Sequence, residues 1–168
     1  QGDQQAVAFG QAGDLALQAV ADFTGLGAGM RIGKAGRVVG LDNSYSSLAL
    51  ARDRILSIPH CSLVQANAAL PSFKNNSFDV VMAIQNGISA FHVHQKELVK
   101  ACLQVTKRGG LLLFSSYSAK FWDHRREWFR MQAEAGLLGE IDEEKTRDGV
   151  IICKDGFKAT TVSPEQFL

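Results

Sequence analysis

The feature that most constrains the fold is a regular alternation of apolar runs and helical segments between residues 36 and 116. The apolar runs, most of them rich in β-branched or long aliphatic residues, cover 36–42, 61–66, 78–87 and 111–116. Two of the intervening segments, 46–58 and 95–106, space their apolar residues along one face of a helix. In the second, this face consists of Leu98, Val99, Cys102 and Leu103, and KRGG at 107–110 is the turn that ends the helix. Because strands that alternate with helices are joined by crossover connections, the pattern predicts a doubly wound, mainly parallel α/β sheet with helices on both faces.

Length, charge and cysteine content limit the partners and the location that we expect. The chain has 168 residues, of which 46% are hydrophobic, and this suits one domain across 1–168. Lys and Arg number 18 against 17 Asp and Glu, so no field of one sign would attract nucleic acid or an anionic membrane. Three scattered cysteines without a CxxC pair, and the lack of an apolar run of about 18 residues, favour a soluble, reduced, cytoplasmic protein.

The last third of the chain lacks this alternation. Residues 118–138 have the periodicity of one long amphipathic helix. One stripe of this helix passes through Phe121 and Trp128, and a second passes through Trp122 and Phe129. The interleaved arginines suggest stacking on nucleic-acid bases, but the near-neutral charge favours an amphipathic lid or substrate-side helix.

Two turn signals follow this helix. Asp155-Gly156 stands between two β-rich runs and predicts a hairpin with a two-residue turn, in which both central residues have positive φ. The closing SPEQFL places Gln166 three residues after Ser163, which is the pattern of a capping box. Since so short a helix is not stable alone, we expect the domain to be incomplete at its C-terminus.

Four ordered blocks resemble a known family. They are GRVVGLDNS, NAALPSFKNNSFDVV, AIQNG and VTKRGGLLLFSSYS, and together they span residues 36–118. In this order they resemble the class I S-adenosylmethionine-dependent methyltransferases, which have a Rossmann-like fold. The resemblance implies S-adenosylmethionine as cofactor and transfer of its methyl group. Because the AIQNG block lacks the Asn-Pro-Pro-aromatic signature of methyltransferases that act on bases or glutamine, we expect a small-molecule acceptor.

The resemblance assigns cofactor contacts to the residues that follow two of the strands. Asp42, with the adjacent Asn43, matches the acid that accepts hydrogen bonds from the ribose hydroxyls, a role that suits the two oxygens of a carboxylate. The Asn67-Ala68 pair stands where the family has Asp-Ala for adenine, so the acceptor oxygen is kept but the charge is lost. The alternatives are local: Asp42 caps a turn, and Asn67 supplies a turn conformation.

Gln85 and Asn86 end the next strand, where family members line the methyl-donor pocket, although polar residues before a glycine also simply end strands. The sequence identifies no catalytic base, and His92, His94 and Tyr117 are candidates only by their position near this edge. His92 and His94 also have the spacing of two metal ligands, but no third ligand follows, so we expect no metal. The oligomeric state is not assigned.

The cluster Gly25, Gly27 and Gly29 has the spacing of the family's cofactor loop, but its flanks disagree with that role. The preceding residues favour helix rather than a buried strand, and too few residues follow for a crossover helix. GLGAGMR matches instead the turn that enters the family's first strand. On this alignment the first strand and the glycine-rich loop are missing between Arg31 and Ile32.

This alignment leads to a structural expectation and two alternatives in function. The first strand of the family lies centrally in the sheet, so we expect its slot to be filled and the junction after Arg31 to be longer than one peptide bond. Residues 1–13 and 118–148 are the lid candidates. A missing loop favours a non-catalytic methyltransferase-like binding module, and a third possibility, a nicotinamide-dependent oxidoreductase, is disfavoured because Met30 replaces the last glycine of its motif.

Overall fold

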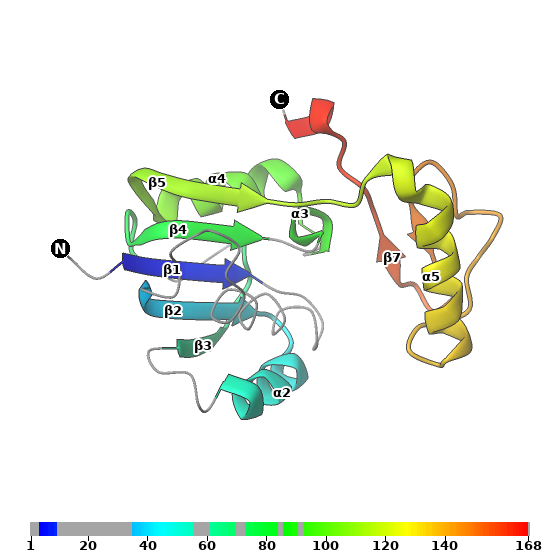
Figure 1. The fold of residues 1–168 in the computed structure, drawn as a ribbon, viewed down its shortest axis with the longest axis horizontal. Coiled ribbons are helices and arrows are strands. Elements are labelled where there is room, and N and C mark those ends of the chain that lie inside the picture. Colours follow the sequence, from blue (N-terminus) through cyan, green and yellow to red (C-terminus); the bar gives the residue numbers. More distant parts are fainter. Residues whose placement is uncertain are drawn as a thin grey trace. The chain divides into compact units, whose positions relative to one another are not determined.

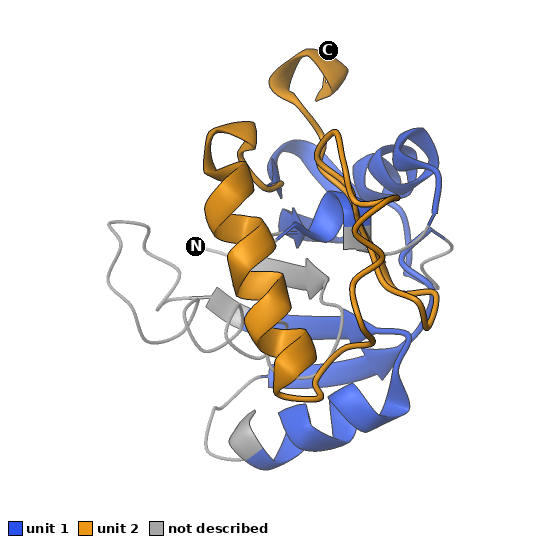
Figure 2. Cartoon of the chain, turned by 90° about the vertical axis from the view of Figure 1, so that its right-hand side faces the viewer, with its two compact units in different colours: residues 1–115 blue, residues 116–168 orange. Residues whose placement is uncertain are grey.

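The structure is a computed structural model that describes residues 4–9, 35–55, 61–69, 73–83, 86–90 and 93–167. The chain divides into two compact units, residues 1–115 and 116–168, which Figure 2 colours separately. A single domain across 1–168 stays a prediction. Within the described ranges, no helix is both long and apolar enough to cross a membrane.

Unit 1 contains a five-stranded sheet in which every pairing is parallel, and the arrows of Figure 1 accordingly point one way. The strand order is β3-β2-β1-β4-β5. The strands are β1 Gln4–Phe9, β2 Ala35–Asp42, β3 Cys61–Gln65, β4 Phe78–Ala83 and β5 Thr106–Phe114. This confirms the predicted Rossmann-like α/β sheet, in which the carboxyl ends of all strands lie along one edge.

The central slot of the sheet is filled, as predicted, but by an unexpected segment. β1, Gln4–Phe9, pairs with β2 on one side and with β4 on the other. The assignment of residues 1–13 to a lid is therefore wrong for 4–9, because these residues supply backbone donors and acceptors to two neighbouring strands. The glycine cluster and the Arg31–Ile32 junction lie outside the described residues.

β2 and β4 show why the sheet needs cover on both faces. Val38 and Val39 of β2 are consecutive, yet each is only 5% exposed. Val81 and Met82 of β4 are consecutive and still more buried. Because successive side chains of a strand point to opposite faces, a run of buried neighbours means that both faces are covered.

Three helices described in unit 1 connect these strands: α2 Tyr45–Ile55, α3 Gly87–Ala90 and α4 Gln95–Val105. α2 packs on β2 and β3, and α4 packs on β4 and β5. α4 buries Leu98 and Cys102, as its periodicity predicts, but Leu103 is 58% exposed because the buried face turns toward Ala101 and Val105. That part of the predicted face is wrong.

β5 begins earlier than the sequence predicts. The KRGG segment, expected as a turn at 107–110, lies inside the strand, and its pairing with β4 shifts register between Phe78 and Val80. Gly109 has φ +78°, which accommodates this irregularity. A Cβ on Gly110 would lie 2.8 Å from the backbone oxygen of Asp79, so only glycine allows the two strands to approach here.

Unit 2 is built on helix α5, Trp122–Glu134, which follows a 3₁₀ turn at Ala119–Phe121. The helix stops short of the predicted residue 138 because Gly136 adopts φ +70°. The amide of Gly136 donates to Ala133 O, and that of Leu137 donates to Gln132 O. These two bonds form a Schellman motif, which satisfies the last carbonyl groups of a helix.

The predicted hairpin is present, with β6 Ile151–Ile152 antiparallel to β7 Lys158–Ala159, but its turn differs. The Cys153 amide donates to Phe157 O and the Gly156 amide donates to Cys153 O, which leaves a three-residue loop. Gly156 alone has positive φ in this loop, at +94°. The predicted two-residue turn is therefore wrong, and a three-residue loop with glycine at its last position replaces it.

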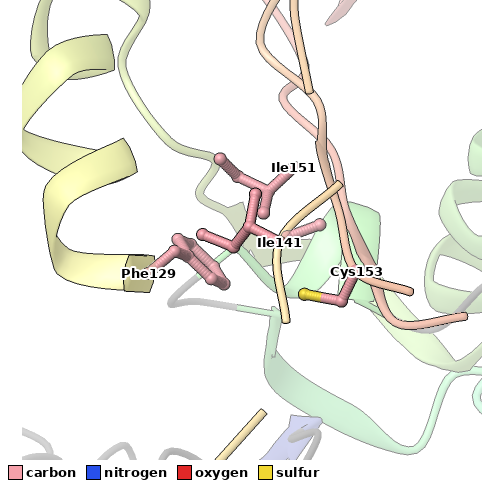
Figure 3. Close-up of a cluster of buried hydrophobic side chains, with 5 residues drawn as sticks. Phe129, Ile141, Ile151 and Cys153 are labelled. Atoms are coloured by element: carbon pink, nitrogen blue, oxygen red, sulfur yellow. The ribbon is translucent and has the colours of Figure 1, made fainter. Parts of the chain in front are cut away.

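The core of unit 2 joins α5 to the hairpin. Its buried members are Phe129, Ile141, Ile151, Cys153 and Ala159, and Figure 3 labels four of them. Trp122 and Ala133 also pack against this core, which confirms the stripe predicted through Trp122 and Phe129 as the inward one. After the hairpin, the Ser163 amide donates to the side chain of Gln166 at 2.8 Å, which is one of the two bonds of the predicted capping box, and a 3₁₀ helix, Pro164–Phe167, follows.

Candidate functional site

Asp42 ends β2 at the carboxyl edge of the sheet, where ligands bind in open α/β folds. Its side chain is only 1% exposed. Oδ1 accepts a hydrogen bond from the Ser44 amide at 2.8 Å, while Oδ2 is buried and has no partner among the described residues. A buried acceptor without a donor is costly, so Oδ2 is suited to a hydroxyl group of a bound molecule.

The electrostatics of Asp42 agree with this geometry. Burial raises the pKa of its carboxyl group, and hydrogen bonds from the backbone amides of Ser44 and Asn43 partly oppose that rise. A further hydrogen bond to the charged carboxylate would lower its pKa again. A ribose diol, which offers two hydroxyl donors, fits these requirements.

The polar residues after β2 and β3 are engaged locally. Asn43 is exposed, and its carbonyl oxygen accepts from Gln65 Nε2 at 3.1 Å, which ties together the ends of these neighbouring strands. Asn67 is also exposed, and its Oδ1 accepts from the Ala69 amide at 2.9 Å. This bond closes an Asx turn, which is the local role that the sequence left open for Asn67. Ala68, which lies between Asn67 and Ala69 in the sequence, is buried, with 1% exposure.

Asn86 follows β4 and turns the chain into α3. It has φ +64° and is 6% exposed. Its amide donates to Ser115 Oγ, and its carbonyl accepts from the Ser89 amide at 3.0 Å. Asn tolerates this left-handed conformation better than most residues, which accounts for its place at the strand end. Gln85 lies outside the described residues.

A cavity of about 400 Å³ adjoins the loop after β3. Asn67 and Ala69 form one wall, and Glu97 and Lys100 of α4 contribute to the other. Its volume lies within the range of small-molecule pockets. These α4 residues were not predicted from the sequence, although Glu97, Lys100 and Gln104 recur at the spacing of one polar helix face.

The remaining candidates have structural explanations or lie elsewhere. His94 is the N-cap of α4, where its Nδ1 accepts from the Lys96 amide at 3.3 Å. The described residues contain no cluster of three potential metal ligands, and His92 falls outside them. Tyr117 belongs to unit 2, where burial raises the pKa of its phenol and nearby Arg125 opposes that rise.

Comparisons with known proteins agree with this architecture. Residues 24–110, just over half of the chain, match the family described as methyltransferase domain. No curated protein sequence matches the chain.

Three solved structures illustrate the likeness of fold. A SAM-dependent methyltransferase from Methanosarcina mazei has a TM-score of 0.64 and 17% identity, over 99% of this chain and 76% of that one. YcgJ from Bacillus subtilis has a TM-score of 0.56 and 18% identity, over 77% and 53% of the two chains. The N-methyltransferase NodS from Bradyrhizobium japonicum WM9 was solved in complex with S-adenosyl-L-homocysteine. It has a TM-score of 0.55 and 15% identity, over 75% of this chain and 57% of that one. This chain thus spans little more than half of YcgJ and NodS.

Proposed function

This chain belongs to the methyltransferase domain family, and we propose that it binds S-adenosylmethionine through Asp42 and methylates a small-molecule acceptor. S-adenosylmethionine supplies an already activated methyl group when bound. The protein's contribution is therefore to bind, align and exclude water rather than to generate a strong nucleophile. The near-neutral charge supports a small acceptor over nucleic acid or membrane, and the three scattered cysteines support the cytoplasm as the location.

The observation that carries the proposal is the unpartnered Oδ2 of Asp42. The oxygen belongs to a buried side chain at the carboxyl end of β2. Ser44 holds the other oxygen and so fixes the orientation of the carboxylate. A diol hydroxyl is the donor that best matches such a fixed acceptor.

Ala68 and Asn86 support the proposal in a different way. Both are buried and follow the carboxyl ends of strands, Ala68 after β3 and Asn86 after β4, and Asn86 has positive φ. We assign to Ala68 and the preceding Asn67 a place beside the adenine ring, and to Gln85 and Asn86 a place beside the methyl donor. Asn43, which follows Asp42, is the remaining residue that we propose to contact the cofactor.

Isothermal titration with S-adenosylhomocysteine tests cofactor binding without knowledge of the acceptor. We expect saturable heat from the unaltered protein. Asp42→Asn keeps the size of the side chain but removes its charge, so affinity should fall by about 10- to 100-fold, the value of a hydrogen bond to a charged group. Asp53→Asn, the same change on the exposed surface of α2, should leave the affinity unchanged.

Two results would overturn the proposal. The first is a folded protein that gives no heat at millimolar ligand. The second is equal affinity in the unaltered protein and the Asp42→Asn variant, because Asp42 would then not contact the ribose. Circular dichroism of each variant establishes that the sheet is intact.

One observation favours a non-catalytic binding module as the second candidate. The acceptor oxygen of Asn67 is already engaged by the Ala69 amide, so it is not free to receive a hydrogen bond from adenine without opening the turn. A module of this kind would keep the fold but give no heat with S-adenosylhomocysteine. The titration above therefore separates the two candidates.

A further inference from the structure

Arg125 is a buried cation in unit 2. Its side chain is 6% exposed and projects from the first turns of α5. Nη2 donates to Gly149 O at 2.6 Å, and Nη1 donates to the hydroxyl of Thr161. Nε is buried and has no partner among the described residues. The guanidinium is thus held firmly by neutral acceptors, while one of its donors is left over.

Two aromatic rings contact the guanidinium. Its central carbon lies 4.7 Å from the ring centroid of Tyr117 and 4.7 Å from that of Trp122. Cation–π contacts stabilise the charge, but they do not neutralise it. Tyr117 and Trp122 are themselves only partly buried.

No carboxylate neutralises Arg125 in the part of unit 2 that the structure describes. The neighbouring Arg126 pairs with Glu143 at 2.8 Å, and Arg130 pairs with the same carboxylate. Arg130 also lies 3.5 Å from Glu127, and the remaining ion pairs described in this unit involve lysines. An unpaired buried charge is strongly unfavourable, so the arrangement lacks one negative group.

We propose that Arg125, Tyr117 and Trp122 form a binding site for the carboxylate group of a small molecule. Nε and the remaining Nη hydrogens are the donors for its two oxygens, which guanidinium groups bind as a planar pair. This site is independent of the cofactor binding proposed for Asp42.

Charge matching favours a carboxylate over a phosphate monoester. The site offers one uncompensated positive charge, because Arg126 and Arg130 are committed to Glu143. A carboxylate carries one negative charge and balances it. A phosphate monoester carries close to two near neutral pH and would leave a buried negative charge.

Tryptophan fluorescence measures this binding directly, because Trp122 contacts the guanidinium. The two tryptophans of the chain are Trp122 and Trp128, so a Trp128→Phe background isolates the relevant signal. Sodium acetate is titrated against sodium chloride and sodium phosphate at matched ionic strength. We expect a saturable change with acetate, and only a small linear change with the other two salts.

Variants of two adjacent arginines provide the matched comparison. Arg125→Gln should abolish the acetate response, and Arg125→Lys, which keeps the charge but loses the planar donors, should weaken it at least several-fold. Arg126→Gln is the control, since Arg126 lies over the same Trp122 ring at 5.9 Å but already has a carboxylate partner. Its response should equal that of the background protein.

The outcomes are distinct. A missing or unsaturable acetate response in the background protein overturns the site, as does an unchanged response in Arg125→Lys. Arg125→Lys decides the matter even if Arg125→Gln does not fold. A saturable phosphate response equal to that of acetate overturns the choice of carboxylate. Failure to bind S-adenosylhomocysteine, with the acetate response intact, overturns the proposed function but leaves the carboxylate site standing.

Discussion

Asp42 and Ser44 share a 2.8 Å hydrogen bond between one carboxylate oxygen and a backbone amide, and this bond leaves the second oxygen buried without a described partner. Both roles that the sequence allows for Asp42 are therefore compatible in one side chain. Oδ1 caps the turn that leads into α2, and Oδ2 is the oxygen proposed to bind the cofactor. The hydrogen bond to Oδ1 fixes the orientation of the carboxylate and so positions Oδ2 for that role.

The pH dependence of stability tests the burial of Asp42. Burial raises its pKa in the folded state, so the folded protein holds this proton more tightly than the unfolded chain does. Stability therefore falls as pH rises from the unfolded pKa through the folded one. Asp42→Asn removes the ionisation, so without ligand the stability of the variant relative to the unaltered protein should increase as pH rises above about 4. Urea unfolding followed by circular dichroism measures this difference.

Asp53→Asn is again the control, because it removes an exposed acid from α2. A stability difference that grows equally in both variants would show that general charge reduction, not the burial of Asp42, is responsible. The Asp42→Asn variant would then combine weaker cofactor binding with no gain in stability.

Hydrogen exchange tests the place of β1. Because Ala6, Val7 and Ala8 are paired on both sides, their amides should exchange as slowly as those of β4. Mass spectrometry of peptides that cover 4–9 and 78–83 gives the comparison. Rapid exchange in the first peptide, with slow exchange in the second, would remove Gln4–Phe9 from the centre of the sheet.

Gly156→Ala tests the three-residue hairpin loop. The space around Gly156 is open, since a Cβ there would meet nothing within 4 Å. The destabilisation comes only from the φ of +94°, which is unfavourable for residues with a Cβ. We expect the free energy of unfolding to fall by about 1–2 kcal/mol. Urea unfolding followed by tryptophan fluorescence measures it. Lys158→Ala, at the exposed position of β7, should change stability by less than about 0.5 kcal/mol.

Truncation of Ile151 tests the core of unit 2. Ile151 is fully buried, so Ile151→Ala should cost about 2–5 kcal/mol. Leu137→Ala is the matched aliphatic truncation, at a position that is 72% exposed, and should cost little. Both tryptophans lie in unit 2, so their fluorescence reports its unfolding. Equal costs at the two positions would contradict the assigned core.

Elements with strong local signals could be predicted from sequence. β2 follows from consecutive apolar residues that end at an acid, and the Ser163–Gln166 cap follows from a fixed spacing. β1 could not be predicted, because its central place depends on pairing with strands distant in sequence. The two-residue turn predicted at Asp155-Gly156 was wrong for a related reason. The Asp155 carboxylate accepts hydrogen bonds from the amides of Gly139 and Phe157, and the local sequence does not reveal these contacts.

The candidate site divides in the same way. Family motifs identify Asp42, since an acid after the second strand is a positional signal. The Asx turn of Asn67 was foreseen only as an alternative, because the sequence cannot show which donor its oxygen meets. Arg125 was missed altogether, since its burial requires Gly149 and Thr161 from segments well beyond α5.

The central place of β1 has a consequence for synthesis on the ribosome. Val7 pairs with Val39 on one side and with Val81 on the other. The edge of β1 that pairs with β4 therefore stays unpaired until β4 has left the exit tunnel. During that interval the waiting edge exposes unpaired backbone donors and acceptors, which can recruit another strand. A nascent chain from which β4 has not yet emerged therefore carries an open edge at what becomes the centre of the sheet.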